Sequence, residues 1–245
     1  MNSCESGGKL RVLAGILAVS LLVAGCGSAE APASATTTVS LLLYQEQEAG
    51  IEPYPVRIMV TPDFVRFDDG YAGSDFMLMQ RATRTIYNVS HEERRILVIT
   101  SPAVAAGVTH DLALEQLRET DASAPLIAGK QPLHIRFLAN AEECYHAVVV
   151  PGLLPEAAAG LAEFAVLLGE RQRSDLQSVP ADMQTPCFLA RYAYAPERHL
   201  LAGLPVQEWD TDGYRRSLVN FSAAEAVPRE LFELPPDYER MPLDG

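Results

Sequence analysis

The chain has 245 residues and a formal net charge of −13 at pH 7, because 32 acidic residues outnumber 19 basic ones. So acidic a protein is not drawn by charge to nucleic acid or to anionic lipid head groups, and neither is predicted as a partner. The length that remains after the N-terminal segments suits one domain with its own core.

The N-terminus has the pattern of a secretion signal. Lys9 and Arg11 form a basic start, and residues 12–23 follow without a charge. That apolar run is too short for a comfortable permanent membrane span. It therefore favours a signal peptide over residues 1–25.

The apolar run ends in Leu22-Val23-Ala24-Gly25-Cys26, which resembles the bacterial lipobox. The resemblance implies cleavage before Cys26 and acylation of its thiol, so that N-terminal acyl chains hold the protein on a lipid bilayer. Ordinary secretion, with Cys26 incidental, is the alternative. Gly27 stands where many lipoproteins retained in the inner membrane have Asp. The resemblance thus implies the periplasmic face of the outer membrane.

A flexible tether and then a run of strands are predicted next. Residues 26–38 are mostly Ala, Ser, Thr, Pro and Gly, which bury little surface. The folded domain is predicted for residues 39–240. Its first part alternates apolar and polar residues and turns at Asp68-Asp69-Gly70, which is typical of antiparallel hairpins. Strands are predicted at residues 40–44, 56–61, 63–67, 76–80, 83–89 and 95–99.

Two helices are predicted in the second part of the domain. Leu112, Leu114 and Leu117 suggest a short helix over residues 110–120. A longer one begins at Pro155 and continues into its last turn at residues 171–173. Strands are predicted at residues 133–138, 144–150, 187–194, 203–209 and 215–221, with a type I′ turn at Asp212-Gly213 and an extended proline-rich end.

The four cysteines have separate predicted roles. Cys4 is lost with the signal, and Cys26 carries the lipid. Cys144 and Cys187 remain as a pair in an oxidising compartment, which predicts a disulfide between them. Metal binding or a redox pair are the alternatives, and no CxxC or nearby histidine spacing supports either.

Two sets of short motifs mark strands and turns rather than catalysis. The first comprises residues 66–70, 85–87 and 96–99, and the second comprises residues 203–205, 212–213, 231–235 and Tyr238. Together they resemble an uncharacterised family of secreted bacterial domains related to the periplasmic lipoprotein carriers LolA and LolB. The resemblance implies an α+β fold: a curved, mostly antiparallel open sheet, or LolA-like half-barrel, with two or more helices packed on its concave side around a hydrophobic cavity.

No catalytic or metal-binding motif occurs in the sequence. The five histidines share no ligand spacing, and His134 and His146 are interpreted as hydrogen-bonded sheet residues. Asp68 and Asp69 could form an acid–base pair or a calcium site, but a turn explains them with fewer assumptions. A non-enzyme without cofactor or metal is therefore predicted.

Two functions remain open on the sequence alone. The first is a lipoprotein that binds an apolar ligand, an acyl chain or a lipid, because the strands at residues 76–79 and 96–99 are apolar on both faces. The second is an accessory or structural outer-membrane lipoprotein with a filled core that binds another envelope protein. The candidate lining residues of an apolar site are Phe76, Leu78, Ile96, Val98, Leu161, Phe164 and Leu168.

Overall fold

A computed structural model describes residues 35–101 and 111–243, and these described residues belong to one compact unit. The predicted signal peptide, Cys26 and most of the predicted tether lie outside the described residues. The first strand begins at Thr36, three residues before the predicted start of the domain.

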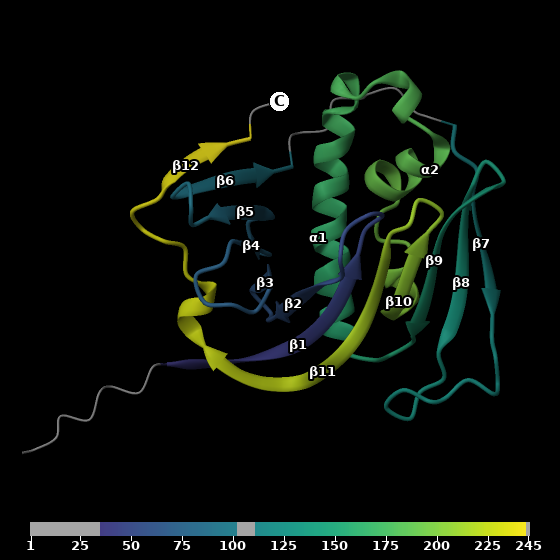
Figure 1. Ribbon diagram of the computed structural model, residues 1–245, viewed down its shortest axis with the longest axis horizontal. Helices are drawn as coiled ribbons and strands as arrows, with labels where there is room; N and C mark the ends of the chain where they lie inside the picture. The colour runs from purple at the N-terminus through teal and green to yellow at the C-terminus, as the bar shows by residue number, and fades with distance from the viewer. Residues whose placement is uncertain (1–34, 102–110, 244–245) are drawn as a thin grey trace, which may run out of the picture. The chain divides into compact units, whose positions relative to one another are not determined.

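The described strands form one 12-stranded sheet (Figure 1). Its order is β12-β6-β5-β4-β3-β2-β1-β11-β10-β9-β8-β7. Strands β1 to β6 form a first meander of sequential hairpins, and β1 pairs with β11 of the second half. In that second half, α1 and a series of short helical turns separate β9 from its neighbour β10 along the chain. All neighbours are antiparallel except β12, which lies parallel to β6. The strands are β1 (Thr36–Gln47), β2 (Tyr54–Val60), β3 (Phe64–Asp68), β4 (Phe76–Gln80), β5 (Thr85–Ser90), β6 (Arg95–Thr100), β7 (Leu114–Glu119), β8 (Leu133–Ala139), β9 (Glu142–Val150), β10 (Leu204–Asp210), β11 (Arg215–Pro228) and β12 (Glu239–Pro242).

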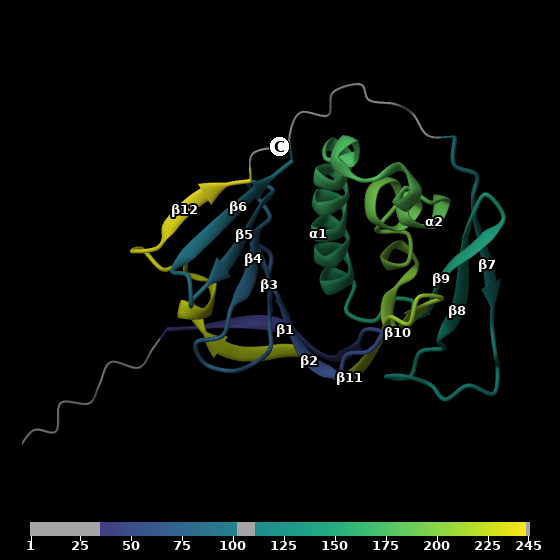
Figure 2. The ribbon, with the colours of Figure 1, turned by 45° about the horizontal axis from the view of Figure 1, so that its top comes forward.

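The long helix α1 (Pro155–Ser174) lies in the bend of the sheet and contacts β2, β3, β6 and β10 (Figure 2). Pro155 occupies its first turn, where a missing N–H costs nothing. Gly160 lets the helix come close to the sheet, because a Cβ there would lie 2.9 Å from Cγ1 of Val60. We call the face of the sheet toward α1 the inner face and the opposite one the outer face.

The segment after α1 is a chain of short helical turns. The Cys144–Cys187 disulfide, with 5.1 Å between the two Cα atoms, joins β9 to α2 (Pro186–Phe188) and confirms the predicted pairing. A π-helical segment, η3 (Leu189–Tyr194), follows directly. Three 3-10 helices complete this segment: η1 (Leu176–Ser178), η2 (Ala181–Met183) and η4 (Leu200–Ala202). A further 3-10 helix, η5 (Arg229–Phe232), follows β11 near the C-terminus.

The predicted fold class, α+β with two or more helices packed on the concave side of the sheet, is wrong. One large mixed sheet dominates the described residues, and the α-helices in this part of the chain are α1 and the three-residue α2. Residues 114–119, which were predicted as part of a helix, form the edge strand β7. Leu114 and Leu117 have a helical spacing but both remain exposed, so their burial does not favour a helix, and hydrogen bonding to β8 decides the conformation. Residues 189–194, predicted as strand, are helical instead. The β10–β11 hairpin forms, but Gly213 alone in its turn has a positive φ, so the turn is not type I′.

Both faces of the first meander are covered. On the inner face, residues such as Ile58 and Val65 pack against α1. On the outer face, Met59 and Leu78 pack against Phe232 of η5. Successive residues of a strand point to opposite faces of the sheet. Because both faces of these strands are covered, their residues are apolar on both sides.

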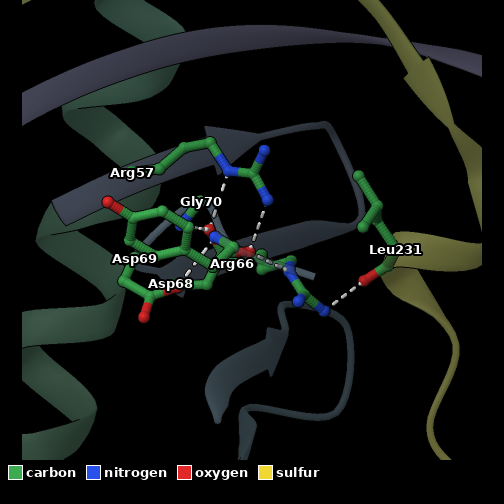
Figure 3. A network of polar contacts seen from close by, with 7 residues as sticks. Arg57, Arg66, Asp68, Asp69, Gly70 and Leu231 are labelled. Atoms are coloured by element: carbon green, nitrogen blue, oxygen red, sulfur yellow. Dashed lines mark hydrogen bonds and ion pairs between the residues drawn. The ribbon is translucent and has the colours of Figure 1, made fainter. Parts of the chain in front are cut away.

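A buried ionic cluster attaches the C-terminal segment to the outer face (Figure 3). The Asp68 carboxylate accepts hydrogen bonds from Arg57 Nε at 2.7 Å and from Arg66 Nε at 2.6 Å. Arg66 Nη1 also donates to the Leu231 carbonyl at 2.6 Å. Asp68 further accepts from the Gly70 N–H, at 3.0 Å, as a turn residue does. Asp68 is therefore a structural anion, in agreement with the turn interpretation.

Candidate functional site

A cavity of about 330 Å³ lies between α1 and the inner face of the sheet. Its volume falls at the lower end of the range typical of small-molecule sites, about 300–1,000 Å³. One wall is apolar and the other is polar. The lining residues are Phe67, Tyr145, Leu161, Phe164, Ala165, Leu168, Gly169, Arg191, Tyr192, Pro196, His199, Leu200, Glu208, Tyr214 and Arg216.

The apolar wall comes mainly from one stripe of α1. Leu161, Phe164 and Leu168 recur at spacings of three and four, which places them on one helical face. The Phe164 ring packs 4.5 Å from the Phe67 ring of β3, measured between centroids. This contact joins the helix to the sheet at the edge of the cavity.

The polar wall is centred on Glu208 of β10, which is only 2% exposed. Arg216 of β11 places Nε 2.6 Å from Glu208 Oε2. His199 Nε2 lies 3.1 Å from Glu208 Oε1, and the Tyr145 hydroxyl donates to the same oxygen. Three neighbours thus surround one buried carboxylate.

The protonation states of this wall follow from burial and charge. Burial lowers the pKa of His199 to about 4, so its imidazole is neutral at pH 7. Burial alone would raise the pKa of Glu208, but the charge of Arg216 and the other neighbours outweighs it and lowers that pKa. Glu208 is therefore ionised, and Arg216 neutralises it.

Arg191 forms the end of the polar wall next to the disulfide. Its guanidinium carbon lies 4.3 Å from the centre of the Tyr145 ring and 4.9 Å from that of Tyr214, which are cation–π distances. Arg191 also forms a salt bridge with Asp210 of β10. Because η3 carries Arg191 and begins two residues after Cys187, the disulfide helps to position this side chain.

A second, more open hollow of about 600 Å³ adjoins the cavity. The two share Phe67, Tyr214 and Arg216 in their linings. Acidic residues, including Glu46 and Asp75, border the second hollow. The amphipathic cavity therefore continues into a wider acidic opening.

The structure divides the predicted lining residues into two groups. Leu161, Phe164 and Leu168 line the cavity. Phe76, Leu78, Ile96 and Val98 belong to the core on the outer face, although Phe76 also borders the second hollow.

Sequence reasoning missed the polar wall. The available signal was Glu208, which shares a strand face with buried Val206 two residues earlier, and a charge at an inward strand position is unusual. Its partners Tyr145, His199 and Arg216 lie on other elements, and no spacing in the sequence relates them.

Within residues 35–101 and 111–243, no group of three or more His, Cys, Asp or Glu side chains is placed to hold a metal ion. The same described part contains no helix with the length and apolar character needed to cross a membrane.

Comparison with known proteins gives no family assignment. No family model matches the chain, and no curated protein matches it. Two solved structures of PNGF-II are similar at 10% and 9% identity, with TM-scores of 0.41 and 0.38. They match 85% and 84% of this chain, which spans about a third of their length, 31% and 32%.

Proposed function

We propose that this protein is a periplasmic, membrane-anchored lipoprotein without enzymatic activity that binds an apolar ligand, an acyl chain or a lipid, beneath α1. The observation that carries this proposal is the cavity whose one wall is the stripe Leu161, Phe164 and Leu168. The predicted acylation of Cys26 supplies the attachment to the outer membrane.

The energetics of the two walls favour an amphipathic guest. Apolar surface removed from water stabilises a complex by about 25 cal/mol per Å², so a chain laid along α1 gains most of its affinity there. The polar groups opposite would fix its orientation, as a few placed polar groups do in ligand sites.

The polar wall supports binding better than catalysis. The Glu208 carboxylate is already engaged by Arg216, His199 and Tyr145. A general base needs a free lone pair within reach of its substrate. The His199 imidazole faces Glu208, and its pKa of about 4 is far from the range in which proton exchange at neutral pH is efficient.

The second candidate, an accessory lipoprotein that binds an envelope protein, is favoured by one feature. Strand β7 is the last strand at its edge of the sheet and is exposed along its length, with Leu114 and Leu117 at 40% and 41% exposure. An exposed edge with apolar side chains is a template for strand addition by another chain.

Filling the cavity tests the first candidate. In a mature chain that begins at Gly27, Ala165→Phe places a ring inside the cavity, and Ala159→Phe on the exposed side of the same helix is the matched control. A fluorescent fatty acid should bind the unmodified chain and Ala159→Phe saturably, and Ala165→Phe at least about tenfold more weakly.

Two outcomes contradict the proposal. Equal binding by Ala165→Phe and Ala159→Phe would place the probe elsewhere. No probe binding, together with no lipid retained by the protein in native mass spectrometry, would leave the accessory role.

A further inference from the structure

The second hollow, of about 600 Å³, combines aromatic rings with carboxylates in its lining. The rings are those of Tyr54, Phe67, Phe76 and Tyr214. The carboxylates are those of Glu46, Asp68, Asp69 and Asp75. The negative face of an aromatic ring attracts cations, and an ionised carboxylate neutralises them. Because Phe67 and Tyr214 also line the cavity beneath α1, one ligand can occupy both spaces.

Two of these side chains are already engaged by the protein's own cations. The Asp68 carboxylate accepts hydrogen bonds from both Arg57 and Arg66 (Figure 3). The guanidinium carbon of Arg66 also lies 3.7 Å from the centre of the Phe76 ring, which is a cation–π contact. A ligand in the hollow therefore meets the other rings and the other carboxylates.

Asp69 and Asp75 are engaged only by the backbone. Asp69 Oδ1 accepts a hydrogen bond from the Tyr71 N–H at 2.9 Å, and Asp75 Oδ1 accepts one from the His91 N–H at 2.7 Å. In the described part of the chain, neither carboxylate forms an ion pair. A carboxylate has about four acceptor sites, so each retains both its charge and sites for a further donor.

The charges around the hollow do not cancel. Arg216 lies between two carboxylates, with Nε 2.6 Å from Glu208 Oε2 and Nη1 3.5 Å from Glu46 Oε1. Together with Asp68 and its two arginines, and with Asp69 and Asp75, five carboxylates face three guanidinium groups. The remaining two negative charges attract a cationic group and repel an anionic one.

We propose that the second hollow binds the ammonium head group of an amphiphile whose hydrocarbon chain lies in the cavity beneath α1. This inference rests on the proposed function, because the cavity supplies the site of the chain. The head group packs against the rings of Tyr54 and Tyr214, and Asp69 and Asp75 neutralise it. A fatty acid binds through its chain as well, but more weakly, because its carboxylate meets the negative charge of the hollow.

Two amphiphiles with the same dodecyl chain separate the contribution of the head group from that of the chain. Dodecyltrimethylammonium and dodecanoate are titrated below their micellar concentrations into the mature chain that begins at Gly27, at pH 7 and low salt, in a calorimeter. We expect one molecule to bind per chain, and the ammonium compound to bind at least about tenfold more tightly. This preference should shrink in about 1 M NaCl, where the screening length is about 3 Å.

A double variant tests the two carboxylates. Asp69→Asn with Asp75→Asn removes both charges, and each amide oxygen can still accept the backbone hydrogen bond. The preference for ammonium should fall to about threefold or less. Glu142→Gln with Glu225→Gln is the matched control, because it removes the same charge at two exposed positions outside the hollow. The control should keep the full preference.

Three outcomes contradict the inference, and they separate it from the proposed function. Equal binding of the two amphiphiles to the unmodified chain would overturn the assignment of the head group and leave the apolar cavity as the binding site. A preference retained in the Asp69→Asn, Asp75→Asn protein, or ammonium binding that Ala165→Phe does not weaken, would place the cation elsewhere. If neither amphiphile binds, the proposed function fails together with this inference.

Discussion

The Cys144–Cys187 disulfide supports both the stability of the domain and the geometry of the cavity. It joins β9 to the start of the helical segment that carries Arg191. We predict that the double substitution Cys144→Ala and Cys187→Ala destabilises the fold and weakens ligand binding. The two effects have different origins. The loss of stability arises because the unfolded chain is no longer cross-linked, and the loss of ligand binding arises because η3 is no longer held in position.

The loss of stability can be estimated from the loop that the bridge closes, whose ends are 43 residues apart. Loop-closure entropy for that length corresponds to about 4 kcal/mol at 25 °C. For a domain of this size, that loss should lower the melting temperature by roughly 8–16 °C. Both sulfur atoms lie in a packed region, where Cys144 contacts the core around Phe137 and Ala190, so small cavities left by Ala would add to the loss.

Urea unfolding of the oxidised protein, the reduced protein and the double variant measures this effect. The reduced protein and the double variant should unfold at similar, lower concentrations, and reductant should leave the double variant unchanged. A difference below about 1 kcal/mol would refute the loop-closure reasoning. Free thiols at both positions in the untreated protein, found by non-reducing peptide mapping, would refute the pairing itself.

Three further outcomes are expected. Asp68→Asn leaves Arg57 and Arg66 without their shared carboxylate and should cost about 3 kcal/mol of unfolding free energy at pH 7. The difference should shrink only below about pH 3.8, because these arginines hold the pKa of Asp68 below that ordinary value although burial acts to raise it. His199 has a folded pKa of about 4, lowered from 6.5 by burial, so the unfolded chain takes up the proton first. Stability should therefore fall by about 3 kcal/mol from pH 6.5 to 4, and a His199→Gln protein followed by urea unfolding across this range should lack that fall. Cys26→Ala should abolish the incorporation of labelled fatty acid into the protein, and incorporation that persists in this variant would contradict the lipobox interpretation.

The first meander could be predicted because its signals are local. Strand β4 (Phe76–Gln80) has the predicted bounds, and β6 (Arg95–Thr100) differs by one residue. Alternation and tight turns suffice where each strand pairs with the next one in the chain. The start of α1 at Pro155 was predictable for the same reason, because its first turn carries its own signal.

The errors in the predicted secondary structure occur where contacts between distant parts of the chain determine the conformation. Residues 114–119 have a helical spacing of leucines, and only pairing with β8 makes them a strand. The cavity shows the same limit. The stripe of Phe164 and Leu168 follows from helical periodicity, whereas Glu208 and Arg216 meet only because β10 pairs with β11.

Two glycines hold the helix above the cavity at both ends of its lining stripe. A Cβ at Gly160 would lie 2.9 Å from Val60, and one at Gly169 would lie 2.8 Å from Pro196. The helix backbone is thus in direct contact with its neighbours on either side of Phe164 and Ala165. No intervening side chains are available there to rearrange if the helix tilts. A ligand of larger cross-section cannot displace α1 and must be accommodated by changes in the conformations of individual side chains. We therefore expect the cavity to discriminate guests by cross-section more sharply than by chain length, since surplus length can extend into the adjoining acidic opening.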